Sequence, residues 1–377
     1  MPWGARDTVS LREEFVLLAM KQELNFSELC RRFLVSRKTG YKWLRRAALP
    51  AQDALQDLSR RPRSSPHQTP AEIEARLVDL RLKRPQWGGR KLKRVLEDAG
   101  VRGVPATSTI TGILRRHGLI VEAESQKRGP FQRFERAAPN EMWQMDFKGD
   151  VAMDIGRCHP LTIVDDHSRY AVGLFACGNE RTSTVREHLV TVFRRYGVPQ
   201  NILCDNGPPW GTAGAAERHT ELTVWMMQAG VRVLHGRPYH PQTQGKDERF
   251  HRTLKAEVLF QRIIDLERGQ ARFDSWRQDY NWVRPHQALN LDVPGKRYAP
   301  STRPYCEHPQ EPEYGGSGIE TRKVDAYGSF KLWGRKWKIG KAFVGRTVAV
   351  EPTQEDGIYK VFYYGQQIKT LDRRSVQ

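Results

Sequence analysis

Between residues 10 and 47, apolar side chains recur three or four positions apart, which is the spacing of helices that bury one face. A segment beginning at Ser27 indicates a helix capped by that serine, and a turn at residues 35–36 leads into a further helix. We therefore predict three short helices with a turn before the last one, the arrangement of a helix-turn-helix unit. The expected buried residues of this unit are Leu29, Phe33, Val35 and Trp43.

A second helical pattern covers residues 70–121. Its first helix begins at Pro70, its second is basic and is closed by Gly100, and its third spans residues 107–116. This pattern predicts a second helix-turn-helix unit with a winged-helix-like organisation.

The pattern changes at residue 140, where short apolar runs begin to alternate with helical stretches. This alternation predicts an α/β domain with a mixed sheet. The expected strands cover residues 143–147, 161–165, 170–176, 201–205 and 231–235, and the expected helices cover residues 182–196, 215–229, 245–267 and 270–282.

Near the C-terminus, two short alternating runs at residues 344–350 and 359–364 are interrupted by glycines and predict a small, SH3-like β-barrel. The expected fold class is therefore multidomain α+β, with all-α units first, an α/β core next and the barrel last. The predicted boundaries are 1–48 for the first helix-turn-helix domain, 49–69 for a linker, 70–121 for the second helix-turn-helix domain, 122–139 for a basic linker, 140–300 for the core and 314–377 for the barrel.

Charge identifies the kind of partner that this organisation serves. The chain of 377 residues carries 62 Lys and Arg against 43 Asp and Glu, a net charge of +19. Most of the excess precedes residue 139, and a basic arm beside a nearly neutral body predicts a nucleic-acid partner. The alternative, a basic three-helix bundle without DNA, explains the charge less well. The residues expected to contact DNA in these segments are Arg37, Lys38, Thr39, Lys42, Arg61, Arg63, Arg90, Lys91, Thr107, Thr109, Arg115, Lys127 and Arg128.

Several classes of protein are excluded by composition. The longest apolar run near the N-terminus, residues 15–20, is far shorter than the roughly 20 residues that span a bilayer. No secretory signal pattern is present, and the five cysteines form no CxxC pair, so neither a disulfide framework nor a cysteine-rich zinc site is expected. We expect a soluble protein of the cytosol without a membrane partner.

Three acidic residues occupy positions suited to metal chemistry. Asp146 and Asp205 each end a predicted strand, where α/β proteins place their sites, and Glu248 lies near the start of a helix. Converging carboxylate oxygens are the ligands that Mg²⁺ or Mn²⁺ prefers. Taken singly, each acid is more often a turn residue or a partner of a helix dipole. Their order and local contexts together favour a metal site.

Three segments carry a family resemblance. These are Trp143–Phe147, Asp205–Gly207 and the long block His240–Lys255. Together they resemble the three catalytic blocks of integrase-core DDE transposases. More narrowly, the chain resembles bacterial insertion-sequence transposases related to retroviral integrases.

By this resemblance, Asp146, Asp205 and Glu248 are the catalytic and metal-binding residues of a ribonuclease-H-like fold. They would hold two Mg²⁺ ions per active site, with Mn²⁺ as a possible substitute. Lys255 matches the basic residue that the family places two helical turns after its glutamate, and Arg252 lies between them on the same helix face. Both basic residues are expected to contact DNA.

Two features depart from the family pattern. The interval between Asp205 and Glu248 is longer than the compact spacing of the retroviral enzymes, and we interpret residues 208–215 as a loop insertion. Asp247 occupies a position where an apolar residue is commoner, and we expect its side chain to be solvated rather than to join the metal site.

The resemblance implies phosphoryl transfer on double-stranded DNA. The enzyme would bind the terminal inverted repeats of an insertion sequence, nick the element ends and join each 3′-hydroxyl to target DNA, as a homodimer or higher oligomer in a synaptic complex. Two alternatives are a DNA-binding regulator whose core has lost its chemistry and a ribonuclease-H-like nuclease without strand transfer. The intact acids argue against the first, and the two DNA-reading units argue against the second.

Overall fold

The computed structural model describes residues 7–49, 54–57, 68–120, 135–211, 219–236, 245–316 and 318–374. The chain divides into two compact units, residues 1–68 and 69–377. No helix in these described ranges is both long enough and apolar enough to cross a membrane.

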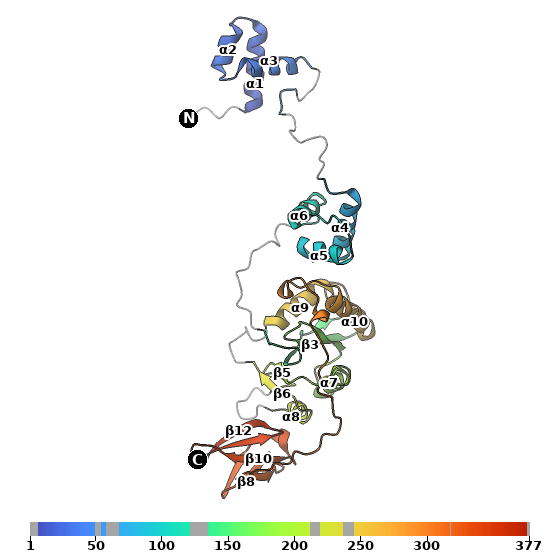
Figure 1. Cartoon of the computed structure of the whole chain (residues 1–377), viewed down its shortest axis with the longest axis vertical. Coiled ribbons are helices and arrows are strands. Elements are labelled where there is room, and N and C mark those ends of the chain that lie inside the picture. The colour runs from blue at the N-terminus through green and yellow to red at the C-terminus, as the bar shows by residue number, and fades with distance from the viewer. Residues whose placement is uncertain are drawn as a thin grey trace. The chain divides into compact units, whose positions relative to one another are not determined.

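The first unit contains the three predicted helices, α1 (Thr8–Lys21), α2 (Phe26–Arg32) and α3 (Arg37–Ala47), labelled in Figure 1. Leu29 and Trp43 are buried as expected, and the predicted residues Phe33 and Val35 pack half-buried against the same core. The expected cap of α2 is wrong. Asn25 caps this helix by accepting a hydrogen bond from the amide of Ser27, so the helix begins earlier than predicted.

The second unit begins with three further helices, α4 (Ala71–Lys83), α5 (Gly89–Asp98) and α6 (Thr107–Arg116). Leu77, Leu92 and Ile110 are completely buried and form a core between them. Gly100 follows α5 with a φ of 74°, a left-handed conformation that favours glycine and ends the helix where the sequence predicts.

A mixed sheet forms the centre of the second unit, as predicted. Its strand order is β2-β3-β1-β5-β6. Strand β4 lies off this path and also pairs with β3. The central strand β1 runs antiparallel to β3 and parallel to β5. The bounds are β1 (Met142–Phe147), β2 (Val151–Ala152), β3 (Arg157–Asp165), β4 (Ala171–Cys177), β5 (Asn201–Cys204) and β6 (Arg232–His235).

Helices cover both faces of this sheet (Figure 1). On one face, α7 (Thr182–Tyr196) and α8 (Glu221–Gln228) share a core with the buried side chains of β1, β3 and β5. On the other face, α9 (Gly245–Glu257) and α10 (Leu266–Trp282) pack on β3 and β4.

The prediction of a single helix over residues 245–267 is wrong. Helix α9 ends at Glu257, and Asp265 caps the start of α10 by accepting a hydrogen bond from the amide of Arg268. The carbonyls of Gln261 and Arg262 between the two helices accept hydrogen bonds from Arg272 instead of from helical amides. A contact from a later helix therefore stabilises a break that local periodicity does not reveal.

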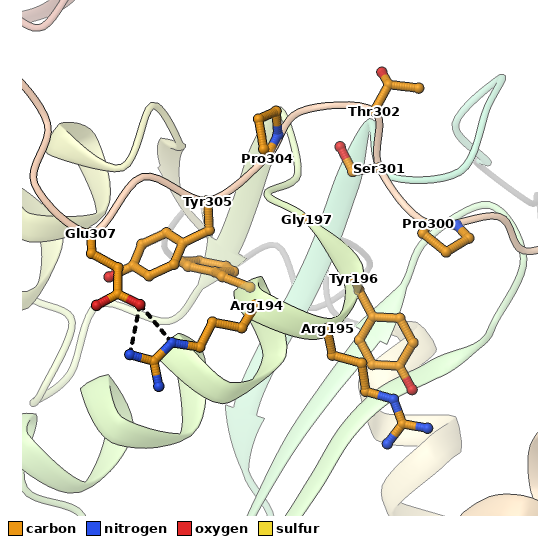
Figure 2. Close-up of a pocket in the computed structure, with 11 residues that line it drawn as sticks. Arg194, Arg195, Tyr196, Gly197, Pro300, Ser301, Thr302, Pro304, Tyr305 and Glu307 are labelled. Carbon is orange, nitrogen blue, oxygen red and sulfur yellow. Dashed lines mark hydrogen bonds and ion pairs between the residues drawn. The ribbon is translucent and has the colours of Figure 1, made fainter.

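After the core, residues 300–307 run across the end of α7 (Figure 2). The amide of Ser301 donates to the carbonyl of Tyr196 at 2.8 Å, and Arg194 pairs with Glu307 at 2.7 Å. A pocket of about 360 Å³ lies between this segment and α7. None of the three predicted acids lines it, so this pocket is not part of the candidate site.

The C-terminal strands form a four-stranded sheet, β12-β11-β10-β7, and a separate hairpin of β8 and β9. The predicted small β-barrel is not confirmed, because these described strands do not close. Val224 and Met227 of α8 belong to the same apolar core as the buried side chains of these two sheets. The bounds are β7 (Glu320–Lys323), β8 (Ser329–Leu332), β9 (Arg335–Lys338), β10 (Thr347–Pro352), β11 (Ile358–Tyr363) and β12 (Gln366–Asp372).

Close packing around Gly40 generates a test of the first unit. A Cβ added at Gly40 in α3 would lie 2.9 Å from Cys30 Sγ and from the rings of Phe15 and Phe26. We expect Gly40→Ala to destabilise this unit by about 1–3 kcal/mol, because the two rigid rings cannot yield without strain. Amide hydrogen exchange across residues 7–49 of the full chain measures the effect.

The matched control is Gly112→Ala in α6, where an added Cβ meets nothing within 4 Å. It should leave exchange unchanged or slower. Equal exchange of residues 7–49 in wild type and Gly40→Ala would contradict the packing described for α3.

Candidate active site

Asp146 is the second-to-last residue of β1, the strand at the middle of the mixed sheet. Its partner across the antiparallel pairing with β3 is Thr162. Trp143 and Met145 of the same strand are completely buried, whereas the Asp146 side chain is half-buried at the strand end. The strand thus holds the carboxylate at the border between core and solvent.

Asp205 directly follows β5, and the next two residues fix its orientation. The Asp205 carboxylate accepts a hydrogen bond from the amide of Gly207 at 3.0 Å. A Cβ at Gly207 would lie 3.2 Å from Asp205 Oδ2, so glycine leaves the room that this turn needs. Asn206 donates its side-chain amide to the carbonyl of Gly236 at 2.9 Å and ties the turn to the segment after β6.

Strand pairing brings Asp146 and Asp205 together. In the parallel pairing of β1 with β5, Gln144 lies opposite Leu203, and each acid comes two positions later on its strand. Beyond the acids, the rings of Phe147 and Trp210 stack with their centroids 5.5 Å apart. The two acid-bearing segments are therefore joined by backbone pairing and by an aromatic contact.

The electrostatics of the pair reflect this proximity. Burial and, after it, the negative charge of Asp205 together raise the pKa of Asp146 to about 7. A hydrogen bond from the backbone amide of Phe147 and the positive charge of Lys148 oppose the shift but do not cancel it. A pair of carboxylates in this state is one that a cation would stabilise.

Glu248 lies in the first turn of α9 and is exposed. Arg252 and Lys255 are exposed on the same face of this helix, as the sequence predicts. Among the described residues, no group of three His, Cys, Asp or Glu side chains is close enough to hold a metal ion. The structure thus brings Asp146 and Asp205 together but does not bring Glu248 to them, and the role of all three stays a prediction.

The expectation of a solvated side chain at Asp247 is wrong. Asp247 is 2% exposed, and its Oδ1 has no hydrogen-bond partner in the described part of the chain. Burial raises its pKa well above the usual range, and the charges of Asp146 and Asp166 act in the same direction. The sequence contains a signal for this burial, because Asp247 shares its helix face with Phe250 and Leu254, which pack on the sheet.

A buried histidine, which the sequence analysis did not select, ties α9 to the central strand. The hydroxyl of Thr162 donates to the carbonyl of Asp146 at 2.9 Å, and His251 Nε2 lies 2.8 Å from the same hydroxyl oxygen. Since that hydroxyl proton is already engaged, His251 acts as the donor through Nε2. Burial lowers its pKa to about 4, with a smaller effect from Lys148, so the ring is neutral.

The residues predicted to contact DNA in the first unit lie on α3. Arg37, Lys38 and Lys42 are exposed. Thr39 is half-buried, and its amide donates to the hydroxyl of Ser36 that caps the helix. The three cations are thus accessible on the surface of α3, and their contact with DNA stays a prediction.

In the second unit, Arg90 on α5 and Thr109 and Arg115 on α6 are exposed, whereas Lys91 and Thr107 are half-buried. Lys91 points into a pocket shared with α9 and does not face solvent as the others do. These contacts stay predictions. Four other predicted DNA-binding residues, Arg61, Arg63, Lys127 and Arg128, lie outside the described residues.

Comparison with protein families matches the chain in segments. The models named "Helix-turn-helix domain" and "Homeodomain-like domain" match residues 11–63 and 39–114. Two models named "Integrase core domain" match residues 136–241 and 229–294. The model "IS481 family transposase, C-terminal domain" matches residues 319–377.

Curated relatives include proteins of insertion elements. The "Insertion element IS407 uncharacterized 31.7 kDa protein" of Burkholderia multivorans is 29% identical over 229 residues, which are 59% of this chain and 79% of the relative. The "Insertion element IS476 uncharacterized 39.2 kDa protein" of Xanthomonas euvesicatoria is 25% identical over 250 residues, which are 64% of this chain and 69% of the relative. The Gag-Pol polyprotein of avian reticuloendotheliosis virus is 29% identical over 210 residues, which are 50% of this chain and 17% of the polyprotein.

Two solved structures are also similar. A simian T-cell lymphotropic virus intasome bound to the PP2A regulatory subunit B56 gamma matches 79% of this chain and all of the compared chain, with 17% identity and a TM-score of 0.38. The HTLV-2 integrase catalytic core domain in complex with magnesium matches 43% of this chain and 97% of the compared chain, with 14% identity and a TM-score of 0.33.

The neutral His251 makes the position of α9 sensitive to pH. The pKa of this ring is near 6.5 in an unfolded chain and about 4 in the folded one, so falling pH protonates the unfolded form first. Its contribution to stability is present above pH 6.5 and is lost as pH falls towards 4. From pH 7.5 to pH 5, we expect opening of α9 to become easier by about 2 kcal/mol.

The comparison is with His251→Gln, which keeps an N–H donor for Thr162 but does not titrate. Amide hydrogen exchange of residues 245–257, corrected for the intrinsic effect of pH, gives the opening free energy of both proteins. The same pH dependence in both would show that His251 does not hold α9 in the way described.

Proposed function

We propose a reaction for this chain, which belongs to the insertion-sequence transposases with an integrase core, in the retroviral integrase superfamily. It binds the terminal inverted repeats of its element, nicks the element ends and joins the freed 3′-hydroxyls to target DNA. The observation that carries this proposal is the side-by-side position of Asp146 and Asp205 at the ends of β1 and β5, inside the segment that matches the integrase core.

The proposed metal ligands are Asp146, Asp205 and Glu248. The described pair fits a divalent cation, because two neighbouring carboxylates repel each other and the pKa of Asp146 is raised to about 7 in consequence of burial and that repulsion. Hard oxygen donors of this kind suit Mg²⁺ or Mn²⁺, and we propose two ions per site. When bound, such ions activate the attacking oxygen and stabilise charge on the leaving oxygen.

The chain's own side chains position the DNA strand. Arg252 and Lys255 lie on the exposed face of α9 that also carries Glu248, so they are placed to hold phosphates next to the scissile one. The contact of His251 with Thr162 keeps this helix against the strand that carries Asp146. The cations of α3 and α6 are proposed to read the terminal repeat in the major groove.

The two steps use the same group of residues. In the first, a water oxygen bonds to phosphorus while the bond from phosphorus to the 3′ oxygen breaks, which leaves a 3′-hydroxyl and a 5′-phosphate. In the second, that 3′ oxygen bonds to a target phosphorus and the target's own 3′ oxygen leaves. Pairing two element ends requires more than one copy of the chain, so we propose a homodimer or larger assembly acting on DNA in the bacterial cytosol.

Isosteric variants of the three acids test this assignment. Asp146→Asn, Asp205→Asn and Glu248→Gln should each reduce nicking and joining by at least about 10³-fold, because the charge that holds the ions is lost while the shape is kept. Labelled element ends incubated with a target plasmid and Mg²⁺ report both products. Binding of the ends should change little.

Asp154→Asn is the matched control, since Asp154 belongs to the same core but pairs with Arg262. It should retain activity. Near-normal joining by any of the three acid variants would refute the assignment. Nicking without joining by the wild type would indicate a nuclease, and binding without either product would indicate a regulator.

A further inference from the structure

A basic pocket separates α5 from the catalytic helix α9 within the 69–377 unit. Its volume is about 370 Å³. Glu257 is the acid among the residues that line it, whereas the cations that line it come from α5, α9, the segment after α10 and the turn before β4. These cations are Lys91, Arg169, Lys246, Arg249, Arg252 and Arg284.

Some of this positive charge is already balanced. Arg284 pairs with Glu257 at 3.1 Å, with both side chains largely buried. Arg169 pairs with Glu135 at 3.0 Å, and Lys246 pairs with Asp166. These pairs use the acids near the pocket and leave a positive excess inside it.

Lys91 contributes the half-buried cation on the α5 side of this pocket. Within the described ranges, the Lys91 ammonium group makes no hydrogen bond or ion pair, although the residue is half-buried. Burial lowers its pKa to about 7, and the positive charge of Arg284 acts in the same direction. His286 is 8% exposed, and its Nε2 has no hydrogen-bond partner among those residues. The pocket therefore contains a half-buried ammonium group, that of Lys91, which an anion would satisfy.

We propose that this pocket binds a backbone phosphate of the element-end DNA, with Lys91 from α5 and Arg252 from α9 as its principal contacts. A phosphodiester supplies the single negative charge and the two acceptor oxygens that these groups lack. Because α9 also carries Glu248, one phosphate would connect the second helix-turn-helix unit to the helix of the active site. This inference rests on the proposed function, since it takes the DNA partner to be an element end.

Docking of α5 against the core brings the two sides of the pocket together. Arg84 forms an ion pair with Asp279 of α10, and Arg94 of α5 lies 3.6 Å from Asp292. Lys91 is thus held towards α9 rather than towards the DNA groove that the sequence analysis assigned to it.

A free inorganic phosphate has the same chemistry as a DNA phosphate, so the test below must distinguish these two ligands.

The test measures binding of the full chain to a duplex copied from the end of the insertion element, without divalent metal, so that no cleavage occurs. Lys91→Gln should raise Kd about ten-fold and reduce the slope of log Kd against log salt by about one ion. Lys91→Arg, which keeps the charge, should bind nearly as well as wild type. Lys83→Gln is the matched control, because Lys83 is exposed on α4 and pairs with Asp79.

A second arm replaces single phosphates of the duplex by uncharged methylphosphonates. Wild type should lose affinity at one position where Lys91→Gln loses none, which a merely structural role of Lys91 would not produce. A third arm titrates inorganic phosphate by calorimetry. Unchanged Kd and salt slope in Lys91→Gln would overturn the proposal, and so would millimolar binding of inorganic phosphate that Lys91→Gln abolishes without any effect on DNA.

Failure of the phosphate site can be distinguished experimentally from failure of the proposed nicking and joining reaction. Because these arms measure binding alone, the pocket can fail while the acid variants behave as expected. Conversely, a wild type that binds through Lys91 but neither nicks nor joins DNA would refute the reaction and leave the phosphate site intact.

Discussion

The parallel pairing of β1 with β5 is the constraint on which this site depends. It places two carboxylates, Asp146 and Asp205, at neighbouring strand ends, where burial and the charge of Asp205 raise the pKa of Asp146. Strands anchored by wholly buried side chains such as Trp143 and Ile202 resist the repulsion between the two carboxylates. The fold thus maintains two neighbouring carboxylates whose repulsion a nearby positive charge would relieve.

Helix α9 connects this pair to the rest of the molecule. One face, with Phe250 and Leu254, packs on the sheet, and His251 links the helix to the backbone of Asp146 through Thr162. The exposed face carries Glu248 and two cations, and a third side borders the basic pocket beneath α5. The net charge of +19 is therefore not spread evenly: it lies mainly on the N-terminal units, and further cations line the pocket beside α9, while Asp146 and Asp205 lie at the centre of the core.

Local pattern predicted much of the fold and few of the contacts. The bounds of α6 and α7 agree with their predicted ranges, because a periodic apolar face and a clear stop signal define each helix. The end of α9 was not predictable in this way, since Arg272 of a later helix binds the carbonyls that follow it. The predicted C-terminal barrel is not confirmed, because the described sheets do not close and α8, distant in sequence, contributes side chains to their core.

At the candidate site, too, local sequence pattern predicted positions along the chain but not the contacts between distant segments. The acids Asp146 and Asp205 were found from strand ends and turn residues, and their pairing follows from the order of the strands. The burial of Asp247 was missed because a charged residue near a helix start is usually solvated, and only packing on the sheet decides otherwise. Lys91 was assigned to a DNA groove because sequence shows its charge but not its direction.

Diffraction from crystals of the full chain soaked in Mn²⁺, with anomalous differences recorded at the manganese edge, tests the central claim most directly. The account predicts manganese between the carboxylates of Asp146 and Asp205, with Glu248 as the third acidic ligand. Manganese held by Asp247 in place of Glu248, or bound away from the Asp146 and Asp205 pair, would contradict it.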